Sequence, residues 1–495
     1  MAQFGSLARD RDVLEKEQIQ SIVFGGFKDL KCSHVLGLGL QPETTATEIL
    51  TLLQFVVQTT RWGDTRATGL GTQLALGPNM FDRLNFGRDG NSAITQNFSM
   101  PFQQGMTAEF RARVLGDQGA QAPDKWAWGN SDKPVDLVLM VYADTAKDLK
   151  AYLDQLAEIA KEANLVVHLD QDTTLPKDKD GVLREPFGFR DGISQPIIKG
   201  ASQSFVTSQK EQVLEPGEFL CGYRDESTRV SQSICLSRSD MAASHLPRMM
   251  SDTAGPVFDF GRNGSYLVVR QLQQDVDGFQ KYCDRAAKTC KEQYKDQTIT
   301  SEYVQAKMIG RWKDGSSMVR HPRKPGNPAN KKPDNDFSFR AEDPQGLGCP
   351  LGAHVRRANP RDSLQQDSQA IVKLSNRHRI LRRGRPYANE KTKGIMFMCL
   401  NADIERQFEF MQDTWLNNSA FHGLQNESDP LFANHGKGGG RFSMPTQQGT
   451  MTLKRMPDFV QMRGGGYYFL PSKRALNFLI ATVKDTALAT KPDEI

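Results

Sequence analysis

The sequence predicts an α+β protein made of two related domains. Its 495 residues exceed what one hydrophobic core usually organises, at a rough prior of about 150 residues per domain. Units of a strand followed by a helix recur in both halves, so each half is expected to form a sheet with helices over one face. We expect an N-terminal domain over residues 1–240 and a C-terminal domain over 241–495.

The clearest of these units lies in the first half. Residues 135–143, VDLVLMVYA, have the composition of a buried strand, and Asp144 is expected to cap the helix that follows. Apolar residues then recur at helical spacing: Leu149, Tyr152, Leu153, Leu156 and Ile159. The stretch 165–170, LVVHLD, follows as a second strand.

The second half repeats this pattern three times. The expected strand and helix pairs are SYLVVRQL with DVDGFQKYCDRAAK, GIMFMCL with DIERQFEFMQDTW, and GGGYYFLPS with KRALNFLIATV. LEPGEFLCGY, residues 214–223, is expected to end the first half, which puts the boundary between about 225 and 260.

Composition narrows the class of protein. A hydrophobic content of 38%, a charged content of 24% and a net charge of +5 are typical of a globular protein and do not favour nucleic acid as a partner. No apolar run approaches the roughly 18 residues of a membrane span, and the first residues lack the layout of a secretion signal. Seven scattered cysteines without a CxxC pair fit reduced thiols. We expect a cytoplasmic protein that binds neither membranes nor nucleic acid.

Two further observations exclude common functions. The basic stretch RHPRKPGNPANKKPDND, residues 320–336, has no interleaved aromatic residues, which favours a solvated loop over a nucleic-acid patch. The sequence contains no GxxxxGK[ST], no GxGxxG after a strand, no GxSxG and no HExxH. Nucleotide hydrolysis, dinucleotide redox chemistry, serine hydrolysis and zinc proteolysis therefore lack their usual motifs.

Three stretches carry candidate chemistry. EPFGFRDGISQP, residues 185–196, sets Asp191 between two glycines, which fits either a capped turn or a positioned carboxylate. The second stretch is GCPLGAHVRRANPRD, residues 348–362, in which three arginines follow His354. The histidine is either a surface residue or a ligand of haem iron, and in the second case the arginines could neutralise the haem propionates. NRHRILRRGRPYA, residues 376–388, is either a basic surface strand or places an arginine in a pocket, paired with an anion.

Taken together and in order, the motifs resemble the dye-decolorizing peroxidase family in its longer-chain branch. The resemblance also covers IQSIVFGGF, LEPGEFLCGY, GRNGSYLVVRQL, MIGRWKDG, NADIERQFEF and GGGYYFLPS, and so spans most of the chain. It implies two ferredoxin-like domains, each an antiparallel sheet with covering helices. It also implies one haem b per chain, in a cavity of the C-terminal domain.

The resemblance also implies roles for single residues. By motif, Asp191 is the distal acid and base, and Arg382 is the distal arginine, with Arg383 as the alternative. His354 is the proximal ligand of the iron, and Asp458 is the carboxylate that orients this histidine. Ile395 and Phe397 stand two apart and share one strand face, so they either line the distal side of the haem or pack in the core. Arg356, with Arg357 and Arg361 nearby, is a candidate for the haem propionates.

The implied function is that of a peroxidase that reduces hydrogen peroxide and oxidises a dye, a phenol or another small aromatic reductant. A carboxylate base keeps working where imidazole is already protonated, so turnover is expected to be best at mildly acidic pH. The alternative is a haem carrier, storage or iron-release protein that uses the same pocket, and a third possibility is a structural module without haem. The chain is expected to be a monomer or a homodimer.

Overall fold

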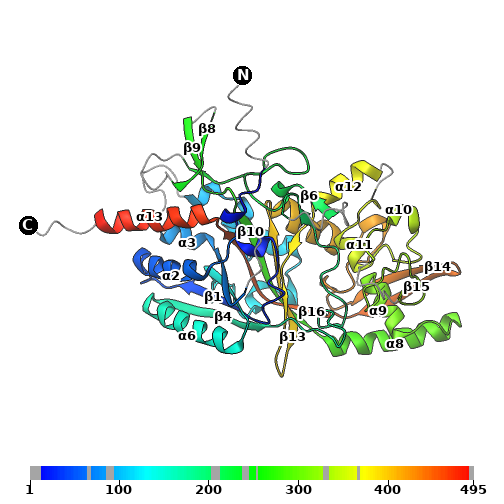
Figure 1. Ribbon diagram of the computed structural model, residues 1–495. Coiled ribbons are helices and arrows are strands. Elements are labelled where there is room, and N and C mark those ends of the chain that lie inside the picture. The colour runs from blue at the N-terminus through cyan, green and yellow to red at the C-terminus, as the bar shows by residue number, and fades with distance from the viewer. Residues whose placement is uncertain are drawn as a thin grey trace, which may run out of the picture.

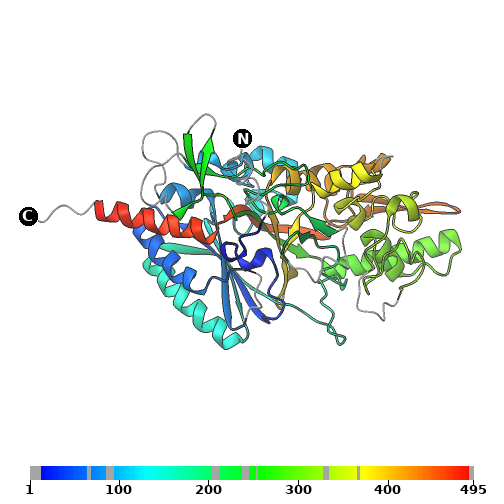
Figure 2. The same ribbon diagram turned by 45° about the horizontal axis from the view of Figure 1, so that its top comes forward.

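The structure is a computed structural model that describes residues 13–63, 68–84, 94–201, 212–236, 245–251, 255–326, 334–364 and 368–489. Residues 327–333, in the middle of the predicted basic loop, lie outside this part of the chain, as does the first stretch, 1–12. Figures 1 and 2 show the described elements as one elongated body, with the first half at one end and most of the second half at the other.

The first half contains one ferredoxin-like unit. Four antiparallel strands run in the order β2-β3-β1-β4, and α2 and α6 connect them in β-α-β fashion. The bounds are β1 (Cys32–Leu40), α2 (Ala46–Thr59), β2 (Leu70–Leu76), β3 (Leu137–Ala143), α6 (Ala146–Glu162) and β4 (Leu165–Thr173). Shorter helices between β2 and β3 are α3 (Pro78–Arg83), α4 (Met100–Gln104) and α5 (Glu109–Leu115).

The predicted strand-helix-strand unit of this half is confirmed, with one change at the helix start. All seven residues of β3 are buried, as a run of apolar residues requires of a central strand. The N-cap of α6 is Thr145, whose hydroxyl accepts from the Asp148 amide, and not Asp144. Asp144 instead accepts a hydrogen bond from the Gly69 amide, which ties the end of β3 to the start of β2.

The second half repeats the same topology. Its strands run in the order β11/β12-β13-β10-β16, all antiparallel, which matches the order of the first unit. The bounds are β10 (Ser265–Gln274), α8 (Val276–Tyr294), β11 (Leu381–Arg382), β12 (Arg385–Ala388), β13 (Lys393–Asn401), a helix made of η9 (Glu405–Glu409) and η10 (Met411–Asn417), and β16 (Val460–Leu470). We refer to the last helix as helix 405–417. The predicted α+β class with two ferredoxin-like units is therefore confirmed, while the division at residue 240 stays a prediction.

The two units join into one nine-stranded sheet. β16 pairs with β2 through Phe469 and Leu76, and at the far edges the Thr174 amide donates to the Pro386 carbonyl at 2.8 Å. The inner faces of the two units pack on each other in a shared core that includes Val138 of β3 and Val269 of β10. The fold is thus stabilised by apolar burial between the units.

Additional elements surround this sheet. The second half adds α9 (Ser301–Ile309), α10 (Phe339–Glu342), α11 (His354–Ala358), α12 (Ser368–Asn376) and the hairpin of β14 (Gly440–Thr446) and β15 (Gly449–Met456), which lie at one end of the molecule (Figure 1). Small sheets are formed by β5 (Ile197–Ile198) with β6 (Val213–Leu214), and by β7 (Cys235–Leu236), β9 (Gly255–Asp259) and β8 (Arg248–Ser251). The last helix, α13 (Lys473–Ala489), returns to lie beside α2 (Figure 1).

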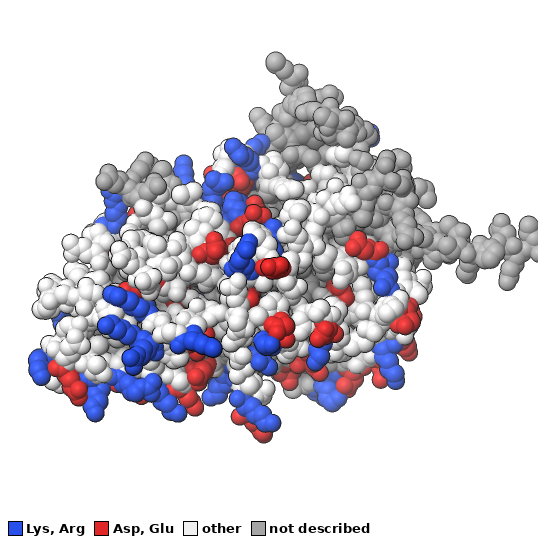
Figure 3. Space-filling model, turned by 180° about the vertical axis from the view of Figure 1, so that it is seen from behind, with Lys and Arg blue, Asp and Glu red and all other residues white. Residues whose placement is uncertain are grey.

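The surface carries both signs of charge. On the face in Figure 3, basic and acidic side chains are interspersed over the lower part, next to a broad area without charge. Among the described residues, no helix combines the length and the apolar character that a bilayer span requires.

Candidate active site

A cavity of about 300 Å³ lies against the outer face of the second sheet unit. Its wall on the sheet is made by alternate residues of β10 and β13, among them Arg270, Leu272, Ile395 and Phe397. The rest of the wall includes seven aromatic side chains, those of Phe187, Phe189, Trp312, Phe337, Phe339, Phe408 and Phe432. Ile395 and Phe397 were predicted to share one strand face, and both line this cavity.

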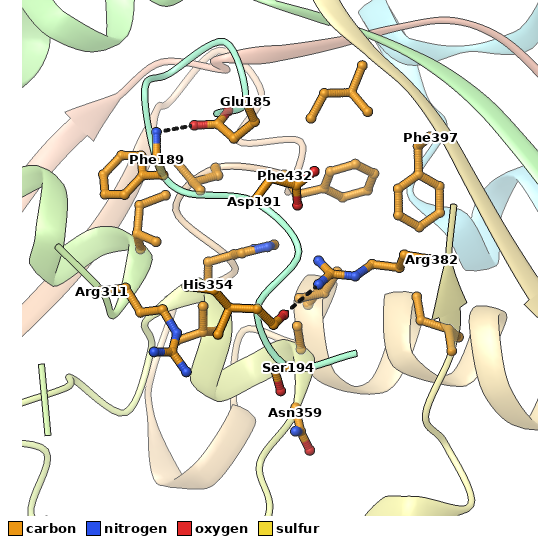
Figure 4. Close-up of a pocket in the computed structure, with 18 of the residues that line it drawn as sticks. Glu185, Phe189, Asp191, Ser194, Arg311, His354, Asn359, Arg382, Phe397 and Phe432 are labelled. Carbon is orange, nitrogen blue, oxygen red and sulfur yellow. Dashed lines mark hydrogen bonds between the residues drawn. The ribbon is translucent and has the colours of Figure 1, made fainter. Parts of the chain in front are cut away.

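The loop that carries Asp191 comes from the first half and closes one side of the cavity. Its two glycines have positive φ, +94° at Gly188 and +77° at Gly192, where a side chain would be strained. The Asp191 amide donates to the Leu183 carbonyl at 3.0 Å, and its Oδ1 accepts from the Gly192 amide at 2.6 Å. The turn is therefore real, and it also directs a carboxylate into the cavity (Figure 4).

Glu185 holds this loop from inside. Its Oε1 accepts from the Phe189 amide at 2.8 Å, and its Oε2 accepts from the Phe187 amide at 2.9 Å and from Gln274 Nε2 at 3.0 Å. Burial, together with the charge of Asp191, raises the pKa of Glu185, against the effect of the three donors. The sequence analysis did not identify this residue, although it opens the EPFGFRDG motif.

His354 faces the cavity from the first position of α11. Its Nδ1 lies 2.9 Å from Oδ2 of Asp429, and because a carboxylate can only accept, the proton belongs on Nδ1. Nε2 then keeps its lone pair, and the ring, with 30% of its side chain exposed, lines the cavity. Figure 4 shows His354, Asp191 and Arg382 around the same space.

Asp429 is fully buried and held by the backbone. Its Oδ1 accepts from the amides of Leu431 at 2.9 Å and Phe432 at 2.8 Å. Burial alone would raise the pKa of this carboxyl, but the hydrogen bond from His354 and the charge of Arg357 hold it below its usual range. This arrangement keeps a carboxylate in place behind the imidazole.

The prediction that Asp458 orients His354 is wrong. Asp458 Oδ1 accepts from the backbone amide of His435 at 2.7 Å and so caps a loop before β14. The family resemblance placed this carboxylate in MPDFVQMRGGGYYF, at the last strand, but the partner comes from ESDPLF, 75 positions after His354. Nothing local in that segment distinguishes Asp429 from an ordinary Asp-Pro turn.

Arg382 lines the same cavity as Asp191 and His354. It sits on β11, lines the cavity, and donates from Nη2 to the Ile193 carbonyl at 3.2 Å, two residues beyond Asp191 (Figure 4). The alternative, Arg383, points to the other side of the strand, where it donates to the carbonyls of Ile22 at 2.6 Å and Val23 at 2.7 Å. Strand alternation separates the two arginines.

The prediction that Arg356 binds a cofactor is also wrong. Arg356 is 1% exposed, donates to the carbonyls of Asp343 and Cys349, and lies over the Phe339 ring at 4.4 Å. Arg357 is likewise bonded to carbonyl groups of the core, at 2.7 Å to Trp415. Since α11 is a single short helix, neighbouring residues leave it in different directions. His354, Val355 and Ala358 line the cavity, whereas Arg356 and Arg357 do not.

Three other arginines gather at the cavity: Arg311, Arg361 and Arg379. Arg311 donates to Asn335 Oδ1 at 3.0 Å, and Arg379 to Gln212 Oε1 at 2.9 Å, so these partners are neutral. Burial and the charge of Arg361 lower the pKa of Arg311 to about 10. Burial, with Arg361 and Arg382, lowers the pKa of Arg379 to about 9. Mutually repelling guanidinium groups beside a cavity favour binding of an anion there.

A ferredoxin-like repeat with a histidine, a carboxylate and an arginine around one cavity is the arrangement that the resemblance of the sequence motifs implied. No family model matches the chain. It is 27% identical to a dye-decolorizing peroxidase of Mycena epipterygia, over 95% of this chain and 88% of that protein. It is 26% identical to dye-decolorizing peroxidase msp1 of Mycetinis scorodonius, over 78% and 74% of the two chains.

The fold comparison agrees. The crystal structure of a DyP-type peroxidase of Anabaena superposes with a TM-score of 0.74, covering 97% of this chain and 96% of that one at 20% identity. The sequence and fold comparisons together support assignment of the chain to the dye-decolorizing peroxidases, a family of oxidoreductases.

Proposed function

We propose that the protein is a haem peroxidase in which Asp191 is the acid and base, Arg382 stabilises charge and His354 is the axial iron ligand. The observation that carries the proposal is that segments 191, 354 and 382, far apart in sequence, line one cavity. Haem b, one per chain, fits the residues present, because an imidazole nitrogen with a free lone pair faces a space lined mainly by apolar side chains, several of them aromatic. When bound, haem supplies electrons for cleavage of the peroxide O–O bond.

The arginines Arg311, Arg361 and Arg379 replace Arg356 as candidates for the propionates. They lie together at the cavity, whereas Arg356 is bonded within the core. Two carboxylates would offset the burial and the repulsion that lower the pKa values of Arg311 and Arg379.

Asp191 would accept a proton from hydrogen peroxide and return it to the departing oxygen. Its Oδ1 accepts from the Gly192 amide, which helps orient the carboxylate toward the space above His354. The Arg382 guanidinium would stabilise negative charge on that oxygen. Its hydrogen bond to the Ile193 carbonyl also ties β11 to the Asp191 loop.

The hydrogen bond from His354 Nδ1 to Asp429 would raise the basicity of Nε2 and fix the ring orientation. A protein that only carries haem requires His354 and the cavity, but not a carboxylate and an arginine held over the same space. The arrangement of Asp191 and Arg382 therefore favours the enzyme over the carrier. The expected reductant is a small aromatic molecule such as a phenol or dye, and the expected form is a cytoplasmic monomer or homodimer.

An absorption spectrum tests the proposal. Purified protein supplied with haem should show a Soret band that shifts on addition of hydrogen peroxide and returns on addition of a phenol. A His354→Ala variant should lose the band. A Soret band that does not respond to peroxide would favour the haem carrier. Absence of the band in the native protein would contradict both the peroxidase and the carrier.

A further inference from the structure

Tyr467 lies one layer behind the cavity wall in a network of buried polar groups. It is on β16, is 3% exposed, and its hydroxyl donates to Glu409 Oε1 at 2.8 Å. Glu409, on helix 405–417, is 1% exposed, and its Oε2 accepts from Arg111 Nη1 of α5 at 2.6 Å. Arg111 also reaches Glu405, an exposed carboxylate, at 3.6 Å, so the network leads from the interior to the surface.

This tyrosine differs from the other tyrosines. The described residues include all ten, and Tyr467 is the one whose hydroxyl is recorded as donating to a carboxylate. Others are bonded to neutral groups, such as Tyr152 to the Thr59 hydroxyl, Tyr223 to Asn263 and Tyr282 to the Lys454 carbonyl. A carboxylate at this distance is a proton acceptor within direct reach.

The network is close to the cavity. Phe408 lines the cavity, and its ring centroid lies 6.4 Å from that of Tyr467 and 6.2 Å from that of Phe397, another wall residue. Arg270, also in the wall, is paired with Asp117 at 2.9 Å and lies near enough to Tyr467 to interact with it electrostatically. An electron would have one aromatic ring to pass between the cavity and the phenol.

We propose that Tyr467 is a redox-active residue that gives up an electron to the cavity while its phenolic proton moves to Glu409. This inference rests on the proposed peroxidase function. Reduction of hydrogen peroxide to two water molecules takes two electrons and two protons. With no external reductant, Tyr467 would supply one electron and haem the other, and the two protons would come from solvent through Asp191. The O–H bond of Tyr467 breaks, the proton joins Glu409, and a neutral phenoxyl radical remains. An external reductant later returns an electron, and the proton moves back to the phenol.

Electrostatics explains why the carboxylate matters. Without an acceptor, oxidation would leave a cationic phenol in the core, at a high desolvation cost. With Glu409, the products are a neutral radical and a neutral acid beside Arg111. Burial, against the effects of Tyr467 and Arg111, raises the pKa of Glu409, which favours the protonated form that the step creates. Burial and the charge of Glu409 raise the pKa of Tyr467 well above its usual value, so the phenol keeps its proton until it is oxidised.

The structure offers a matched control. Tyr468, the next residue on β16, is 2% exposed, but it points into the core between the two sheet units, whereas Tyr467 belongs to the core on the other face. Tyr467→Phe and Tyr468→Phe each remove one buried hydroxyl from the same strand. Glu409→Gln keeps an acceptor for the tyrosine but cannot take up the proton.

The experiment is freeze-quench electron paramagnetic resonance on the haem-loaded full chain after one equivalent of peroxide, without reductant. A radical signal that narrows when tyrosine is ring-deuterated is expected in the native protein and in Tyr468→Phe, and its loss in Tyr467→Phe and Glu409→Gln. A signal that persists in Tyr467→Phe, or disappears in Tyr468→Phe, would overturn the inference. A signal that persists in Glu409→Gln would overturn the role of Glu409 as the proton acceptor.

Peroxide consumption and the Soret band are followed in the same samples. Native protein that consumes no peroxide refutes the proposed function, whereas consumption without a Tyr467-dependent signal refutes only this inference.

Discussion

The two ferredoxin-like units share a strand order but use the same face differently. In the first unit, α2 and α6 pack directly on the sheet, and residues such as Leu139 of β3 and Leu156 of α6 fill the space between. In the second unit, the corresponding face carries Arg270 and Ile395 and borders a cavity. One topology thus produced a solid core in one copy and a site in the other.

The two units differ in what packs between the sheet and its first long helix. In the second unit α8 packs against α9 and the β14–β15 hairpin instead of the sheet. The Asp191 loop, from the first half, occupies the gap, and its Phe187 ring lies 4.7 Å from Phe279 of α8. The first half therefore supplies one wall of the site that the second half leaves open.

The sharpest test of this shared site is removal of the carboxylate that the first half contributes. Asp191→Asn should lower the rate of peroxide reduction about 10²–10⁴-fold, because the amide cannot take up the proton. Arg382→Leu, on the second half, should cost about 10²–10³-fold through lost charge stabilisation. Both are measured by stopped-flow absorbance of the haem-loaded protein. Asp180→Asn, an exposed acid upstream of the loop, is the control; unchanged rates in both site variants would show that the cavity is not where peroxide reacts.

A matched pair of truncations compares the two faces directly. Leu139→Ala and Ile395→Ala remove the same number of carbons from the third strand of each unit. Leu139 is 1% exposed and packed under helices, so its truncation should cost about 2–5 kcal/mol of unfolding free energy. Ile395 borders open space, so in the haem-free protein its truncation should cost well under about 2 kcal/mol. Denaturant unfolding measures both, and equal costs would mean that the second face is packed like the first.

The contact between the halves should depend on pH through Glu218. Its carboxylate is buried beside Arg406, and its carbonyl accepts from the Ala402 amide at 3.0 Å. Burial raises the pKa of Glu218 to about 7, although Arg406 opposes the shift. The folded state then binds the proton more tightly than the unfolded chain, so this contribution is complete below about pH 4.5 and is lost as the pH rises towards 7.

At about 1.4 kcal/mol per pKa unit, the loss amounts to roughly 3 kcal/mol at most. Unfolding free energies measured from pH 4.5 to 8 should show this decline in the native protein and lose it in Glu218→Gln. The exposed Glu162→Gln serves as the control and should keep the decline. A native curve that is flat over this range would contradict the assignment to Glu218.

The smallest expected effect separates the two candidate partners of His354. Asp429→Asn should weaken haem retention or activity about 10–100-fold, because the amide no longer accepts from Nδ1 in the same way. Asp458→Asn should leave both unchanged, since Asp458 contacts the His435 backbone. Haem transfer to an apoprotein acceptor measures retention, and the reverse order of effects would restore the original prediction for Asp458.

Local patterns accounted for most of the fold. The run VDLVLMVYA and the helical spacing from Leu149 to Ile159 depend on neighbours in the chain, and both elements are where the pattern placed them. The helix cap is Thr145 and not Asp144. Asp144 instead accepts from the Gly69 amide at the start of β2, a contact between distant segments that local sequence patterns do not predict.

The sequence by itself determined the α+β class, the repeated units, and the motifs that carry Asp191, His354 and Arg382. It could not identify Asp429, whose segment has no distinctive pattern, and it did not single out Arg311 and Arg379 within the motifs MIGRWKDG and NRHRILRRGRPYA. It also misassigned Asp458 and Arg356. Both belong to recognised motifs, but Asp458 accepts from the His435 amide and Arg356 donates to the Asp343 carbonyl. Tertiary structure decided these cases, because hydrogen-bond partners and cavity walls depend on which side chains meet in space, and neighbouring residues on a strand or short helix point in different directions.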